Sequence, residues 1–217
     1  MAESTEQLIA RLTADAEPVE RLRPPFVRAA GWLGAVALIA ILGVIGLADF
    51  EEFRQRARNP MVPLEIIAAA LTGIASVIAA FQLSLPDRSS WWALLPVPFL
   101  AVWLADSGYN CWRNWIEAGP TGWELGDSAH CFAFIVTLSV PLGVSLWWVL
   151  ARALPLAPGR VAALGGLGIA ALAAALLQFF HPFDITFIDL GVHALTVALV
   201  VAVSSISARR SAAFAAA

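Results

Sequence analysis

The sequence predicts an all-α, polytopic membrane protein: a bundle of six transmembrane helices with a short cytoplasmic N-terminal helix. Of its 217 residues, 60% are hydrophobic and only 13% are charged, a composition that is not typical of a water-soluble protein. Six largely uncharged runs of roughly 20 residues follow one another, each long enough at ~1.5 Å per residue to cross the ~30 Å core of a bilayer. Little is left for a soluble domain, and a net charge of −3 gives no general basis for binding nucleic acid.

The chain divides into three parts by composition. We expect a cytoplasmic segment at 1–28, a membrane domain at 29–206 and a cytoplasmic tail at 207–217. The six spans are expected at about 29–48, 64–83, 91–107, 129–150, 161–180 and 185–206. Every run is too long, and too little alternating, for the strands of a membrane barrel.

The third and last spans have distinctive boundaries. The third is the weakest apolar run, because it contains Pro96 and Pro98 and reaches Asp106 at its end. Residues 181–184 (HPFD) separate the last two spans, and we interpret them as a tight hairpin in which Asp184 caps the sixth helix.

The distribution of arginine predicts the orientation. All thirteen basic residues are arginines, and nine of them fall on the side of the membrane that holds the N-terminus if there are six crossings. The positive-inside rule then places both termini in the cytoplasm, as in a multi-pass protein of the bacterial inner membrane.

The N-terminal segment carries a helix-start signal. Ser4, followed three residues later by Gln7, forms a capping-box pattern that predicts a helix from Thr5 to about Asp15. Pro18 ends or restarts this helix.

Apolar side chains on one face of that helix give two alternatives. The face can rest on lipid, or the peptide can become ordered on a cytosolic partner and insert its apolar side chains into a groove. Five acidic residues in the segment weaken the lipid alternative, because anionic headgroups repel them. The proposed partner-binding residues are Leu8, Ile9, Leu12, Asp15, Val19 and Leu22.

Four candidate ligands collect on the opposite side of the membrane: Cys111, His130, Cys131 and His181. In an oxidising periplasm the two cysteines can form a structural disulfide that closes about 20 residues. Alternatively, the thiols and imidazoles can bind zinc, copper or a heavier thiophilic ion, or sense oxidants. No recognised ligand spacing supports a metal site, and inert, packed thiols are the third alternative.

Other polar residues lie within the expected spans. Asp189 and His193 are four residues apart and share one face of the sixth span, where ionisable groups mark a functional site or a helix-pinning hydrogen bond. We interpret Glu65 and Asp106 as interfacial residues that water can reach. No nucleophile, phosphate-loop or paired-carboxylate motif indicates an enzyme.

Five short motifs in one order carry a family resemblance: LIARLTADAEPVERLRPP from Leu8, WWALLPVP from Trp91, GYNCWRNW from Gly108, GDSAHC from Gly126 and HPFD from His181. Together they resemble the NrsF family of six-helix inner-membrane anti-sigma factors for extracytoplasmic-function sigma factors. The resemblance implies that the N-terminal segment holds the sigma factor away from RNA polymerase, with no direct contact to nucleic acid. It also implies that Cys111 and Cys131 take part in stress sensing.

We expect no bound cofactor, although a thiophilic metal ion is a candidate signal. The N-terminal segment has no Cys or His, so sequestration would depend on the peptide alone rather than on a zinc-containing domain. The rival hypothesis is a small membrane carrier that uses Asp189 and His193, or a thiol oxidoreductase that uses Cys111 and Cys131.

Overall fold

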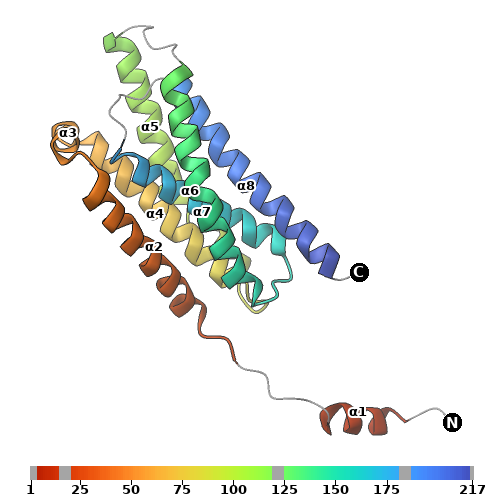
Figure 1. Cartoon of the computed structure of the whole chain (residues 1–217). Coiled ribbons are helices and arrows are strands. Elements are labelled where there is room, and N and C mark those ends of the chain that lie inside the picture. The colour runs from red at the N-terminus through yellow and green to blue at the C-terminus, as the bar shows by residue number, and fades with distance from the viewer. Residues whose placement is uncertain (1–3, 15–20, 119–124, 181–186, 216–217) are drawn as a thin grey trace.

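The computed structural model describes residues 4–14, 21–118, 125–180 and 187–215. Throughout these ranges the regular elements are helices, as predicted, and six long ones lie side by side in a bundle (Figure 1). In chain order the elements are α1 (Thr5–Ala14), α2 (Pro25–Leu47), α3 (Phe50–Arg56), α4 (Met61–Leu83), η1 (Ser90–Leu94), α5 (Val97–Ala118), α6 (Leu125–Ala151), α7 (Pro158–Leu177) and α8 (Phe187–Ala215).

Five helices in the described part of the chain are long and apolar enough to cross a membrane: α2, α4, α6, α7 and α8. They correspond to five of the six expected spans. Side chains on the outward faces of α2 and α8 are largely exposed, as expected for helices that contact lipid.

The third expected span differs from the prediction. Residues 91–107 do not form one helix, because 90–94 form the short 3₁₀ helix η1 and α5 begins only at Val97. Pro98 therefore lies in the first turn of α5, where its missing N–H removes no helical hydrogen bond. Helix α5 then continues to Ala118, and it is more polar than its neighbours because it includes Asp106, Arg113 and Glu117.

The end of the chain also differs from the prediction. The tail expected at 207–217 is helical as far as Ala215, because α8 continues without interruption. Alanine, the residue with the highest helix propensity, dominates this stretch. The hairpin expected at 181–184 and its cap Asp184 lie outside the described residues.

Helix α7 is the centre of the bundle and packs against α4, α6 and α8. Its closest approach is to α4, where two glycines face each other. A Cβ on Gly73 would lie 3.0 Å from the main-chain oxygen of Gly168, and a Cβ on Gly168 would lie 3.1 Å from that of Gly73. Small residues allow such backbone contact between helices in a membrane, where apolar burial alone does not drive association.

Helix α2 is attached to the bundle by its first turns. Arg28 Nη2 donates to the main-chain oxygen of Val149 on α6 (2.5 Å), and its guanidinium lies 5.3 Å from the centroid of the Phe81 ring on α4. One turn later, Trp32 Nε1 donates to Ser145 Oγ on α6 (3.2 Å). These contacts fix the point at which the N-terminal segment meets the bundle.

The alternating helix directions give the bundle two distinct ends. We name the end that holds Cys111 and Cys131 the cysteine end, and the opposite end, with Arg28, Arg152 and Arg209, the arginine end. At the cysteine end, the loop helix α3 docks on the end of α7. Arg56 Nη1 and Nη2 donate to the main-chain and side-chain oxygens of Gln178, at 3.0 and 3.2 Å. The rings of Phe53 and Phe179 stack with centroids 4.7 Å apart.

Because α4 and α7 are in close contact, a larger side chain at that contact should destabilise the protein. Gly168→Val should lower the free energy of unfolding by about 1–3 kcal/mol, because the new side chain meets Val77 and the α4 backbone. Thermal unfolding of the detergent-solubilised protein, followed by circular dichroism, measures the change. Gly34→Val in α2 is the matched control, since nothing lies within 4 Å of its Cβ position. Equal effects of the two substitutions would contradict the packing analysis.

Candidate functional site

The two cysteines lie inside the bundle, each with a side chain only 1% exposed. Cys131, near the start of α6, belongs to an apolar cluster that includes Trp103 of α5 and Ile135 of α6. Cys111, on α5, lies close enough to Asp189 of α8 for the carboxylate to act electrostatically on the thiol. The two cysteines do not form a disulfide with each other in this structure.

The predicted four-residue ligand set is only partly visible. His130 is exposed, in contrast to the adjacent buried Cys131, and His181 lies outside the described residues. Among the described residues, no group of three or more His, Cys, Asp or Glu side chains is arranged to hold a metal ion.

The predicted polar pair on the last helix occupies one face of α8, as the spacing indicated. Asp189 is buried, and His193 Nδ1 donates to the main-chain oxygen of Asp189 (2.9 Å). The hydrogen bond therefore uses the backbone of Asp189 rather than its carboxylate. The Asp189 residue of α8 also lies within electrostatic range of Cys111 on α5. An edge-to-face contact between Trp115 and Phe187, with centroids 5.5 Å apart, connects the same two helices.

The interpretation of Glu65 and Asp106 as interfacial residues open to water is wrong, because both are only 6% exposed. Ser107 Oγ donates to Glu65 Oε1 (3.0 Å), which joins α5 to α4. Asn110 Nδ2 donates to Asp106 Oδ2 (3.3 Å) within α5.

A signal for the burial of Glu65 was present in the sequence. Glu65, Ala68, Thr72 and Ser76 recur every three or four residues and so share one helical face. That face consists of small residues, which is typical of a helix that packs against other helices. The carboxylate at its start was therefore placed to face the bundle.

These contacts define a buried polar cluster at the cysteine end, formed by Glu65, Asp106, Ser107, Cys111 and Asp189. Its members come from three helices, α4, α5 and α8. The hydrogen bond between Ser107 and Glu65 joins α5 to α4, and such a bond is stronger in a low-dielectric interior than in water. An oxidant or ion must enter the bundle to reach either sulfur, since both are buried. A change of charge or volume at Cys111 would therefore act directly on the contact between α5 and α8.

The N-terminal helix is formed as the capping box predicted. The main-chain N–H of Ser4 donates to Gln7 Oε1 (3.2 Å), and that of Gln7 donates to Ser4 Oγ (3.3 Å). Helix α1 ends at Ala14, and Asp15 and Val19 lie outside the described residues.

No residue of α1 is buried, and the helix lies apart from the bundle (Figure 1). Its apolar stripe is open: Ile9 and Leu12 are 59% and 60% exposed, and Leu8 is exposed as well. Leu22, in the segment that leads to α2, is also exposed. The predicted anchors that the structure describes are thus accessible to a partner.

The hydrogen bond between Ser107 and Glu65 predicts a loss of stability when the hydroxyl is removed. Ser107→Ala should lower the free energy of unfolding by about 1–3 kcal/mol, because it leaves a buried carboxyl oxygen without its donor. Chemical unfolding in detergent, monitored by tryptophan fluorescence, measures the loss. Ser205→Ala on α8 serves as the control and should be nearly neutral. If Ser107→Ala is equally neutral, the hydrogen bond does not hold α5 against α4.

Comparison with known proteins adds one finding. The sequence model of the NrsF family, described as negative regulator of sigma F, matches residues 12–214. No curated protein and no solved structure matches the chain. The matched range contains the bundle and all of the polar cluster, and it begins within α1 at Leu12. Since this match covers nearly the whole sequence, the chain belongs to the NrsF family of negative regulators of sigma F.

Proposed function

We propose that this chain is an anti-sigma factor anchored in the bacterial inner membrane. Its N-terminal segment binds an extracytoplasmic-function sigma factor in the cytoplasm and keeps it from RNA polymerase. A metal or redox stress signal in the periplasm acts on Cys111 and Cys131 and releases the sigma factor.

The observation that carries this proposal is the open apolar stripe of α1. A ten-residue helix is marginal by itself in water, yet this one has a complete capping box and exposes Leu8, Ile9 and Leu12. An amphipathic helix with anchors at this spacing fits a hydrophobic groove on another protein. In a negative regulator of a sigma factor, the sigma factor is the partner that such a helix would hold.

The two ends of the bundle support opposite locations for partner and signal. The arginine end is next to the N-terminal segment and holds most of the arginines outside that segment, so the positive-inside rule favours the cytoplasm for it. The cysteine end then faces the periplasm, where oxidants and metals arrive first. For this topology α5 must cross the membrane as the sixth span, and its buried Asp106 would face the bundle rather than lipid.

Helix α6 offers a physical route from the cysteines to the N-terminal segment. Cys131 lies near its start, and Val149 near its end accepts the hydrogen bond from Arg28, the first arginine of α2. A displacement of α6 caused at Cys131 would therefore reach the residue that positions the N-terminal segment. A bias of ~3 kcal/mol between two arrangements would change sigma affinity about 150-fold.

The first test concerns the anchors. The double substitution Ile9→Glu and Leu12→Glu should weaken binding of the sigma factor at least about 30-fold, because even one buried anchor of an interface contributes ~2 kcal/mol or more. Purification of the full-length protein in detergent from its native membrane, followed by mass spectrometry of bound cytosolic proteins, identifies the partner and its yield. Ala10→Glu with Ala14→Glu, on the opposite face of α1, is the matched control. Recovery of the sigma factor with both double variants would exclude the α1 stripe as the binding surface.

The second test concerns the signal. Cys111→Ser with Cys131→Ser should abolish induction of a sigma-dependent reporter by thiophilic metal or oxidant, because the hydroxyls neither bind such ions nor become oxidised. Without metal or oxidant, the reporter should stay repressed. That result would show that the variant folds and still holds the sigma factor. An unchanged response would remove the cysteines from the mechanism.

A further inference from the structure

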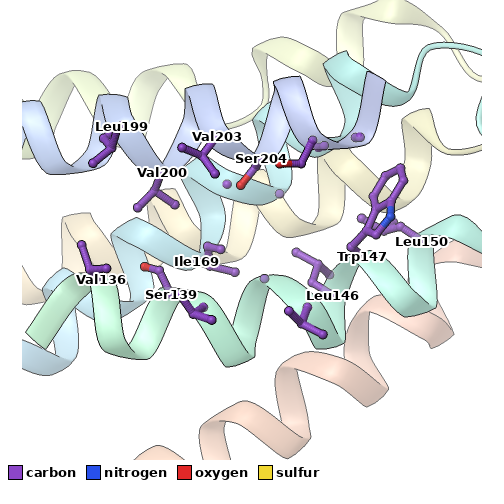
Figure 2. A pocket seen from close by; sticks show the side chains of 18 of the residues that line it. Val136, Ser139, Leu146, Trp147, Leu150, Ile169, Leu199, Val200, Val203 and Ser204 are labelled. Carbon is purple, nitrogen blue, oxygen red and sulfur yellow. The ribbon is translucent and has the colours of Figure 1, made fainter. Parts of the chain in front are cut away.

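A groove of about 350 Å³ opens between α6 and α8. Helix α7 forms its floor. Figure 2 shows Val200 and Val203 of α8 across from Ser139 and Leu146 of α6, with Ile169 of α7 between the two helices. Both walls belong to helices long and apolar enough to cross a membrane, so the groove opens toward the hydrocarbon.

Small residues create this space. Gly143 of α6 and Gly165 and Gly166 of α7 line the groove, and none of them fills it with a side chain. Gly166 is held close to α8, since a Cβ there would lie 2.9 Å from Ser204 Oγ. The helices thus meet firmly at the floor and diverge above it.

The groove changes character along its length. The part of the groove farther from the arginine end is lined by apolar residues such as Val136, Val140 and Leu199. Toward the arginine end α8 contributes Ser204, Ser207 and Ser211, which follow one another at helical spacing. The groove is therefore amphipathic, with hydroxyl groups only in the half nearest the arginine end and in Ser139 of α6.

Its length corresponds to one leaflet. From Leu199 to Ser211 the groove follows α8 for about 18 Å at ~1.5 Å per residue, compared with ~15 Å for half of a hydrocarbon core. A transmembrane helix from a second copy would need an apolar surface about twice as long. An acyl chain from one leaflet matches the observed length.

Positive charge surrounds the end where the serines lie. Arg209 extends over the start of α7, because a Cβ on Gly159 would come within 2.7 Å of its Cγ. The Arg152 guanidinium lies 3.8 Å from the centroid of the Trp148 ring on α6, outside the lining of the groove. Arg160 and Arg210 are exposed at the same end. Among the residues that the structure describes, no carboxylate forms an ion pair with any of these four arginines.

We propose that the groove binds one anionic phospholipid, with an acyl chain against α7, the glycerol region beside the serines and the phosphate among Arg160, Arg209 and Arg210. Basic clusters at the ends of membrane helices attract anionic headgroups in this way. A second copy of the chain is disfavoured, because it would bring a second set of arginines to the same end. The proposal depends on the membrane location of the bundle and not on binding of a sigma factor.

The test uses the full-length protein in detergent and two probes, phosphatidylglycerol and phosphatidylcholine, each with a photoactivatable group on one acyl chain. Labelled peptides should come from α6 and α8. The phosphatidylglycerol probe should label them at a much lower concentration than the phosphatidylcholine probe does. The double substitution Arg209→Gln and Arg210→Gln should weaken labelling by phosphatidylglycerol about 25-fold, because each arginine contributes about fivefold. Labelling by phosphatidylcholine should not change. Arg54→Gln with Arg58→Gln, at the cysteine end, is the matched control.

A second variant tests the groove itself. Val203→Trp fills it and should abolish labelling by both lipids, whereas Ile39→Trp on the exposed face of α2 should not. Equal labelling by the two lipids, an unchanged result with Val203→Trp, or crosslinks between two copies of the chain would overturn the proposal. Because no sigma factor is present, failure of the anti-sigma proposal would leave these results unaffected.

Discussion

The close contact between the backbones of α4 and α7 is the constraint on which the rest of the structure depends. Gly73 and Gly168 bring the two helices together. In a membrane, where lipid competes for every apolar side chain, such backbone contact between small residues is what associates helices. Once α7 is fixed against α4, the other helices have defined places around it. Helix α4 then presents Glu65 to α5 at the cysteine end, and α6 and α8 diverge over the glycine-rich face of α7 to leave the groove.

The sequence was sufficient to predict the helical class, most helix positions and the N-terminal cap, because these depend on local patterns. Apolar runs of membrane length located five helices, and the pair Ser4 and Gln7 located the start of α1. The prediction was less successful where several helices determine the outcome. Pro96 and Pro98 marked the third span as the weakest apolar run, but they did not reveal that its helix begins between them, at Val97.

The site residues show the same difference between features that a local sequence pattern predicts and features that depend on helix packing. The spacing of Asp189 and His193 correctly placed both on one face, but it did not reveal that the imidazole binds a main-chain oxygen and that the carboxylate acts on Cys111. The hydrogen bond of His193 is local to α8, whereas the proximity of Asp189 to Cys111 is set by the packing of α5 against α8, which no local pattern encodes. The burial of Glu65 was recoverable from the small-residue face that it shares with Ala68, Thr72 and Ser76, whereas the attachment of Arg28 to α6 was not.

The proposed function assigns different tasks to the two ends of one bundle. The cysteine end combines buried thiols with buried carboxylates on α4, α5 and α8, and the arginine end holds the start of α2 through Arg28. For a signal at one end to release a protein at the other, the two ends must lie on opposite sides of the membrane. The polar helix α5 must then be a true crossing, although its composition is less apolar than that of the other five.

Cysteine accessibility measures this topology most directly, in a Cys111→Ser and Cys131→Ser background. A single new thiol is placed either at Trp112, exposed at the end of α5, or at Ser4, at the start of α1. A membrane-impermeant maleimide added to spheroplasts should label Trp112→Cys at once and Ser4→Cys only after the inner membrane is broken. Labelling of both thiols from the same side would contradict an anti-sigma factor that senses stress across the membrane.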